Sequence, residues 1–177
     1  DPIAQQVKLV TPDGIIQDHP FIIFSFGLKQ IDWVVSNDRK SIVWTSVREV
    51  AADSLVTTTF IADIEGSNIR EIFNDGPRTN VRALPIAFSE DNSKLFMDTH
   101  PDGISQFAPY TQYAGLFSLD LSTGEIEPLP GEPSCFCGAG LGSDRLLRLS
   151  LNSELDGFDV NVYSVDGGDP RTIPAIT

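Results

Sequence analysis

Short apolar segments that alternate with polar residues run along most of the chain, and polar or glycine-containing turns separate them. Successive side chains of an extended strand point to opposite faces, so a period of two indicates half-buried β-strands. The segments between these strands show no convincing helical period. The pattern therefore predicts an all-β protein.

One turn type recurs at a constant interval. In each of three segments an apolar strand enters a polar turn and a second apolar strand follows; the segments are 33–44, 87–97 and 140–149. Asp38, Asp91 and Asp144 mark these turns and are spaced 53 residues apart each time. Aspartate favours turns because its carboxylate accepts backbone N–H groups, so we interpret the three aspartates as turn formers.

A second hairpin follows each of these turns. Alternating apolar residues flank a glycine-centred turn in the segments 60–72, 116–129 and 160–173. The glycines are Gly66, Gly124 and Gly167, placed where a hairpin favours a residue with positive φ. Two hairpins per unit give four antiparallel strands, which is the sequence signature of a β-propeller blade.

The fold class predicted is therefore a β-propeller segment of about three four-stranded antiparallel blades, with a β-sandwich as the alternative. The blades are expected at about 28–76, 77–131 and 132–177. Residues 1–27 fit no full blade and are expected to supply one or more strands of a neighbouring or partial blade. Within them, 7–14 resembles an outer strand and its turn, and 21–26 is interpreted as another strand.

The repeat resembles a known family. A Ser-x-Asp turn before an apolar strand, followed by the run 62–70 (Ala-Asp-Ile-Glu-Gly-Ser-Asn-Ile-Arg), is similar to the TolB-like, six-bladed propeller repeat. The resemblance covers roughly residues 28–176 and is strongest in the first two units. Family members usually have Pro and Gly around the Asp, where this chain has Asn37 and Arg39. The resemblance implies the fold and, because such propellers often work outside the cytoplasm, a periplasmic or secreted location.

Three blades leave two open radial faces, whereas propellers usually close with about 4–8 blades. We therefore expect either that further blades complete the propeller or that a homodimer does so.

The charge and the composition of the chain limit the classes of partner and cofactor that we expect. The formal net charge of −13 repels phosphate backbones, so nucleic acid is not expected as a partner. No apolar run reaches the roughly 20 residues that span a bilayer as a helix. The acidic residues could favour Ca²⁺, but no Asp-x-Asp-x-Asp-Gly loop occurs in the sequence. We therefore expect neither a metal nor another cofactor.

Catalytic motifs are missing from the sequence. There is no Gly-x-Ser-x-Gly elbow, and the two histidines, His19 and His100, each precede proline and are expected in loops. Cys135 and Cys137 are too close for an unstrained disulfide and are interpreted as small buried thiols. The chain is therefore not expected to be an enzyme by itself.

Two groups of residues are candidates for binding. An insert in the second unit, 103–115, mixes aromatic and amide side chains suited to recognition: Phe107, Tyr110, Gln112 and Tyr113. A local positive cluster, formed by Arg70, Arg78 and Arg82, could take an anionic group, and pairing with neighbouring carboxylates explains it as well. Trp33 and Trp44 are expected in the core.

These observations predict a non-catalytic binding or protein-interaction module with an unidentified protein or small-molecule ligand. The alternative is the propeller portion of a larger, peptidase-type hydrolase whose catalytic residues lie elsewhere.

Overall fold

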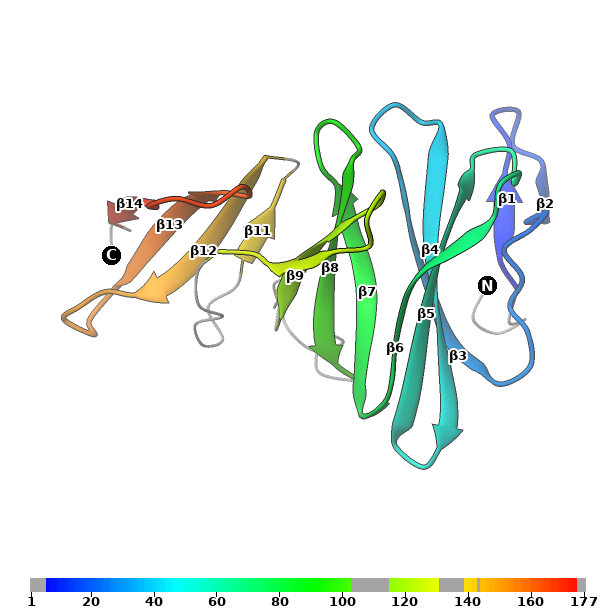
Figure 1. The fold of residues 1–177 in the computed structure, drawn as a ribbon, viewed down its shortest axis with the longest axis horizontal. Helices are drawn as coiled ribbons and strands as arrows, with labels where there is room; N and C mark the ends of the chain where they lie inside the picture. Colours follow the sequence, from blue (N-terminus) through cyan, green and yellow to red (C-terminus); the bar gives the residue numbers. More distant parts are fainter. Residues whose placement is uncertain (1–5, 103–114, 131–138, 143, 175–177) are drawn as a thin grey trace.

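The computed structural model describes residues 6–102, 115–130, 139–142 and 144–174, and these residues contain strands and turns but no helix. Twelve of the strands form three four-stranded antiparallel sheets, and the first two strands form a separate hairpin. The three sheets lie side by side along the long axis of the molecule, in chain order, with the hairpin at one end (Figure 1).

Consecutive strands are neighbours within every sheet. The hairpin is β1 (Lys8–Val10) and β2 (Ile16–Asp18). The first sheet contains β3 (Leu28–Val35), β4 (Ser41–Ala51), β5 (Ser54–Asp63) and β6 (Arg70–Thr79). The second contains β7 (Val81–Phe88), β8 (Lys94–Pro101), β9 (Leu116–Asp120) and β10 (Ile126–Pro128). The third contains β11 (Ala139–Leu141), β12 (Arg145–Leu151), β13 (Phe158–Ser164) and β14 (Arg171–Pro174). The prediction of an all-β segment of four-stranded antiparallel units is confirmed.

The aspartates of the first two repeated turns accept the hydrogen bonds expected of them. Ser36 Oγ donates to Asp38 Oδ1 at 2.7 Å, and the backbone N–H of Lys40 donates to the same oxygen at 3.1 Å. The second sheet repeats this arrangement, with Ser89 Oγ at 2.7 Å and the Ser93 N–H at 3.0 Å from Asp91 Oδ1. Donors favour the charged carboxylate. The Ser93 N–H, followed by the hydroxyls of Ser89 and Ser93, lowers the pKa of Asp91 to about 2.

The third repeat of this turn is chemically different. Gly142 stands 53 residues after Ser89, so the serine hydroxyl that bonds to the aspartate has no counterpart there. The Gly142 N–H bonds to the Arg145 carbonyl at 2.8 Å, which still closes the turn. Asp144 Oδ2 lies 3.4 Å from Arg145 Nε, an exposed contact that contributes little to stability.

The outer hairpins contain the predicted left-handed glycines. Gly66, Gly124 and Gly167 have φ values of 88°, 76° and 98°. This conformation is open to glycine at no steric cost and strained for most other residues. The prediction of glycine-centred hairpin turns is confirmed.

Apolar side chains fill the spaces between neighbouring sheets. The core between the first and second sheets is built from Val43, Ala83, Phe88, Leu95, Met97, Phe117 and Leu119. Phe96, Leu116, Leu129 and Leu146 form the core between the second and third sheets. The first two repeated turns also contact each other directly, because Asn37 Nδ2 donates to the Ser89 carbonyl at 2.7 Å.

The N-terminal segment covers the other face of the first sheet. Phe21 and Ile22 pack on Ile42 and Trp44, and the rings of Phe21 and Trp44 are 5.8 Å apart. The prediction of a strand at 21–26 is wrong, because the backbone there runs across the sheet face without strand pairing. Its apolar residues bury against the sheet, and the Ile22 N–H bonds to the His19 side chain.

Candidate functional site

The four candidates in the second-sheet insert, Phe107, Tyr110, Gln112 and Tyr113, lie outside the residues that the structure describes. Cys135 and Cys137 also lie outside them. The binding prediction for the insert and the interpretation of the thiols therefore stay predictions.

The three arginines of the predicted positive cluster have separate partners. Arg70 Nη2 donates to the Leu121 carbonyl at 2.9 Å and so joins the outer hairpins of the first two sheets. Arg78 Nη1 lies 3.1 Å from Asp75 Oδ2 on the surface. Arg82 is buried and pairs with carboxylates from two directions. The sequence had left pairing with neighbouring carboxylates as one of two explanations, and the structure contains such pairs at Arg78 and Arg82, whereas Arg70 bonds to a backbone carbonyl.

Arg82 belongs to an ion network beside β3 and β7, the first strands of the first two sheets. Its Nη1 is 3.1 Å from Asp32 Oδ2, and its Nε is 3.5 Å from Asp102 Oδ1. Lys29 Nζ lies 2.7 Å from the other Asp102 oxygen. Hydrogen bonding to Asp102 raises the pKa of Lys29. Two cations and two anions thus alternate across the junction of the first two sheets and fix the position of β3.

His100 does not lie in a loop, as its neighbouring proline had suggested. It is on β8, buried, with Nδ1 3.2 Å from Oδ2 of the buried Asp98. The β-ladder continues through it because proline interrupts only the position that follows. Neither ring nitrogen of His100 has a hydrogen bond of good geometry. In a catalytic triad, such hydrogen bonds hold the imidazole in place.

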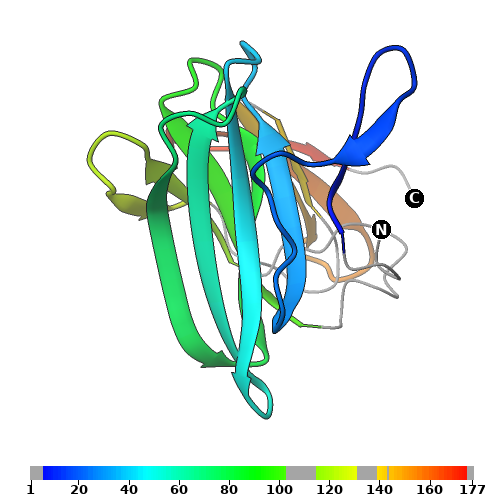
Figure 2. The ribbon, with the colours of Figure 1, turned by 90° about the vertical axis from the view of Figure 1, so that its right-hand side faces the viewer.

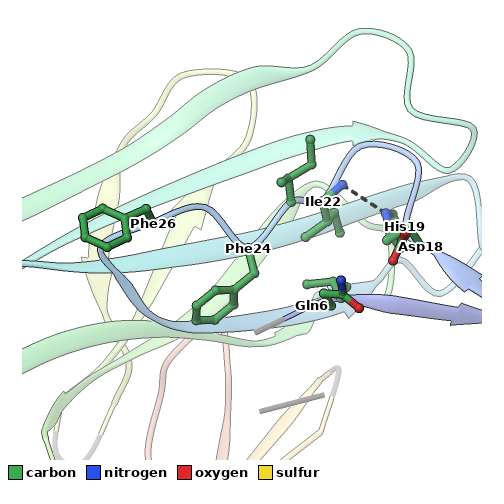
Figure 3. A pocket seen from close by; sticks show the side chains of 8 residues that line it. Gln6, Asp18, His19, Ile22, Phe24 and Phe26 are labelled. Atoms are coloured by element: carbon green, nitrogen blue, oxygen red, sulfur yellow. Dashed lines mark hydrogen bonds between the residues drawn. The ribbon is translucent and has the colours of Figure 1, made fainter. Parts of the chain in front are cut away.

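A concave surface lies between the N-terminal segment and β3. It consists of two adjoining cavities of about 530 and 310 Å³ that share Gln6, Val7 and Phe24, and we call them together the N-terminal recess. The first is also lined by Asp18, His19, Ile22, Ile23 and Phe26, and the second by Lys8, Lys29, Gln30, Ile31 and Trp33. Figure 3 shows Phe24 and Phe26 towards one end of the larger cavity and Asp18 and His19 at the other.

The recess presents apolar surface to solvent. Phe26 is fully exposed, Ile23 is 69% exposed and Trp33 is 56% exposed. The expectation that Trp33 lies in the core is wrong, whereas Trp44 is buried as expected. The two residues are cross-strand partners on one face, and the N-terminal segment reaches only Trp44 closely enough to bury it.

The charged groups of the recess are neutralised within the chain. Lys8 Nζ is 2.6 Å from Asp18 Oδ1, and Lys29 pairs with Asp102 of the ion network. His19 Nδ1 accepts the Ile22 N–H at 3.0 Å, so the proton of the neutral ring lies on Nε2. Burial lowers the pKa of His19, which keeps the ring neutral near pH 7.

Sequence reasoning missed this recess. Part of it comes from residues 6–26, which had been interpreted as strands of a neighbouring or partial blade, and part from residues 29–33 at the start of the first blade. The sequence did contain a signal, because three phenylalanines, at positions 21, 24 and 26, follow His19-Pro20 closely. Such an apolar segment is unusual for a connection that is exposed to solvent.

Among the described residues, no group of three or more His, Cys, Asp or Glu side chains is arranged to hold a metal ion. None of the described elements is a helix long and apolar enough to cross a membrane.

Comparison with known proteins identifies the fold. No family model matches the sequence, and no curated protein matches it. Among solved structures, TolB from Acinetobacter baumannii aligns with 99% of this chain at 14% identity and a TM-score of 0.52. The match covers 42% of that protein, so this chain spans less than half of its length.

Two further structures are similar at lower scores. They are a putative TolB from Agrobacterium tumefaciens (13% identity, TM-score 0.46, 97% of this chain and 62% of that one) and a puromycin hydrolase (16% identity, TM-score 0.45, 91% and 30%). Taken with the three repeated four-stranded sheets, the match to the first TolB structure shows that this chain has the TolB-like β-propeller fold.

Proposed function

We propose that the chain acts as a non-catalytic binding module and that the N-terminal recess is its binding surface. The observation that supports this most directly is a concave surface of about 530 and 310 Å³ in its two parts, with walls that combine apolar and polar groups. Ligand sites commonly measure about 300–1,000 Å³ and combine apolar walls with a few polar groups.

The ligand class follows from the chemistry of the walls. Phe24, Phe26 and Trp33 offer aromatic surface, and the His19 Nε2–H offers a hydrogen-bond donor. Lys8 and Lys29 already have carboxylate partners, so a charged ligand would have to displace an ion pair. We therefore expect an uncharged ligand, or an uncharged segment of a protein, with an apolar face and hydrogen-bonding groups. A location outside the cytoplasm is part of the proposal and is supported by the sequence resemblance alone.

The two tryptophans provide an experiment. In a Trp44→Phe variant, Trp33 becomes the single fluorescent reporter and lies on the wall of the smaller cavity. A screen of neutral peptides and small amphipathic compounds should yield ligands that change its emission. Phe26→Ala should weaken their binding about tenfold, equivalent to about 1.4 kcal/mol, with no change in thermal stability because Phe26 is fully exposed.

Phe158→Ala is the matched control, since Phe158 is a partly exposed phenylalanine on β13. Figure 1 shows β13 at the opposite end of the molecule from the N-terminal hairpin. If ligands are found and both variants bind them equally well, the recess is not the site. Tyr110→Ala and Tyr113→Ala test the insert in the same assay, because loss of binding there would assign the function to that segment instead.

The hydrolase alternative has its own test. A longer reading frame that adds an α/β domain with a nucleophile elbow would favour it, whereas one that adds only further four-stranded repeats would favour the binding module.

A further inference from the structure

The smaller cavity of the N-terminal recess has two polar side chains whose nitrogens are held by carboxylates. Lys29 Nζ lies 2.7 Å from Asp102 Oδ2, and Gln30 Nε2 lies 2.9 Å from both carboxylate oxygens of Asp32. Neither carboxylate is among the residues that line the cavity. The charge that this wall presents to a ligand therefore depends on residues outside the recess.

Asp102 comes from the second sheet, where it directly follows β8. Lys29 and Arg82 are 53 residues apart, and so are Glu49 and Asp102, so these cations and anions occupy matching places in the first two sheets. Lys29 nevertheless makes its ion pair across the junction with Asp102, and Glu49 of its own sheet adds only Coulombic attraction. The second sheet thus supplies the counter-ion of a lysine in the wall of the recess.

Arg82 holds this counter-ion from behind the wall. The arginine is 7% exposed, with Nη1 3.1 Å from Asp32 Oδ2 and Nε 3.5 Å from Asp102 Oδ1. One buried guanidinium therefore lies between the two carboxylates that hold Lys29 and Gln30. Because a guanidinium presents its donors in a rigid fork, it fixes these carboxylates relative to each other.

The remaining charges near Lys29 do not favour an anion. The hydrogen bond to Asp102 is the first cause of the raised pKa of Lys29, and Glu49 and Asp53 attract the same ammonium group more weakly. An anionic ligand would have to displace Asp102 from the lysine and would meet these acidic residues as well.

We propose that Asp102 determines the charge selectivity of the recess: it directs the site to uncharged ligands by holding Lys29, and without it the same wall binds an anion. This inference rests on the proposed function of the recess and names the residue that gives the site its selectivity. The other lysine of the recess, Lys8, pairs with Asp18, which itself lines the larger cavity. Asp102 is therefore the counter-ion that can be replaced without changing a residue of the wall.

Two fluorescent probes with the same aromatic skeleton test this proposal. N-Phenyl-1-naphthylamine is uncharged, whereas 8-anilinonaphthalene-1-sulfonate carries one negative charge on that skeleton. Both are titrated at pH 7.5 and about 0.1 M salt, where charges more than about 10 Å apart are largely screened. Asp102→Asn should raise the affinity for the sulfonate, relative to that for the uncharged probe, about fivefold, which is near the upper end of what an exposed ion pair contributes.

Asp75→Asn is the matched control. It makes the same change in net charge and removes the carboxylate partner of Arg78, and neither of these residues lines the recess. The affinity ratio should therefore stay unchanged in this variant. In a Lys29→Gln background, Asp102→Asn should no longer raise the ratio. Asp102→Ser also lacks the negative charge and should act like Asp102→Asn, and circular dichroism melts show which variants fold.

Three results would each overturn the proposal: an unchanged ratio in the folded Asp102 variants, an equal rise in Asp75→Asn, or a rise that persists without Lys29. The proposed function fails separately, if the unaltered chain does not bind the uncharged probe or if Phe26→Ala leaves that binding intact. In that case the change in sulfonate affinity, and its dependence on Lys29, still decides the role of Asp102.

Discussion

Both ends of the stack of sheets have apolar side chains on a sheet face, but only the first sheet has this face covered by described residues. The free side of the first sheet has a large aromatic side chain, Trp44, and the chain covers it with its own residues Phe21 and Ile22. One side of the third sheet has apolar residues that include Leu147, Leu151 and Phe158, and the described residues leave these three partly exposed. Figure 2 shows the N-terminal hairpin beside the first sheet. The segment that contains Phe21 and Ile22, called the covering segment below, connects this hairpin to β3.

This difference shows that sheet patterning alone does not decide where the core ends. An apolar sheet face stabilises the fold only where something removes it from water. At the N-terminal end a short irregular segment does so and leaves a recess beside itself. On the third sheet, the described residues leave such side chains partly exposed.

The largest expected difference between the ends comes from removing one aliphatic side chain at each. Ile22→Ala deletes a side chain that is 2% exposed and should cost about 2–5 kcal/mol of unfolding free energy. Leu147→Ala deletes one that is 43% exposed and, measured at a concentration where the chain is monomeric, should cost about 0.5 kcal/mol or less. Urea denaturation followed by circular dichroism measures both. Equal costs would mean that the two ends are equally covered.

A second, smaller effect isolates the contact between the covering segment and the first sheet. A Cβ at Gly66 would collide with the ring of Phe21, whereas one at Gly124 would meet no atom within 4 Å. Both glycines have positive φ, so Gly124→Ala should cost only the backbone strain, about 1–2 kcal/mol. Gly66→Ala should cost more because Phe21 must move.

Thermal unfolding compares these two glycine variants, and fluorescence of Trp44 in a Trp33→Phe background reports whether Phe21 has shifted. If Gly66→Ala and Gly124→Ala lose equal stability and the Trp44 emission is unchanged, Phe21 does not hold the segment on the sheet.

The third sheet can be strengthened at the turn where it departs from the repeat. Gly142→Ser restores the residue found at positions 36 and 89, whose hydroxyl bonds to the turn aspartate. A Cβ at Gly142 would be 3.6 Å from the Arg145 carbonyl oxygen, an ordinary contact. The variant should gain about 1 kcal/mol from the hydrogen bond and from the lower entropy of the unfolded chain.

Hydrogen exchange of the β12 amides locates that gain. Adding Asp144→Asn to Gly142→Ser should remove most of it, because the amide is a weaker acceptor than the carboxylate. A gain that persists in the double variant would mean that the hydroxyl does not bond to Asp144.

The repeated part of the fold could be predicted because each turn has a local chemical reason. Asp38 and Asp91 bond to nearby backbone groups, and the hairpin glycines adopt positive φ, so short sequence segments contain the necessary information. The recess could not be predicted in this way. Phe21 and Ile22 have the same apolar pattern in a strand and in a covering segment, and only the position of the first sheet decides between the two.

The positive cluster shows the same limit for charged residues. Arg82 is close in sequence to Arg78, yet its partner Asp32 lies 50 residues away on β3 of the neighbouring sheet. Sequence proximity therefore suggested an anion site, whereas long-range pairing gives an ion network. Residue type and spacing identify the charge; the fold identifies its partner.

The smallest expected effect is a pH dependence confined to the covered end. Burial lowers the pKa of His19 below 6.5, so the folded state resists protonation more than the unfolded state does. Above pH 6.5 the ring is neutral in both states and its contribution to stability is complete. As the pH falls below 6.5 towards the folded-state pKa, the unfolded chain binds the proton first and this stability is lost.

Hydrogen exchange between pH 7.5 and 5.5, corrected for the intrinsic exchange rate, should show reduced protection of the Ile22 amide, which donates to His19 Nδ1, while protection in β12 stays constant. His19→Asn keeps an acceptor for that amide and removes the titration, so its protection should not depend on pH in this range. The pKa values of Asp91 and Asp120 are about 2, so these carboxylates titrate below this pH range. A pH dependence of the Ile22 amide that survives in the His19→Asn variant would show that the segment Phe21–Ile22 is not pH-sensitive through His19.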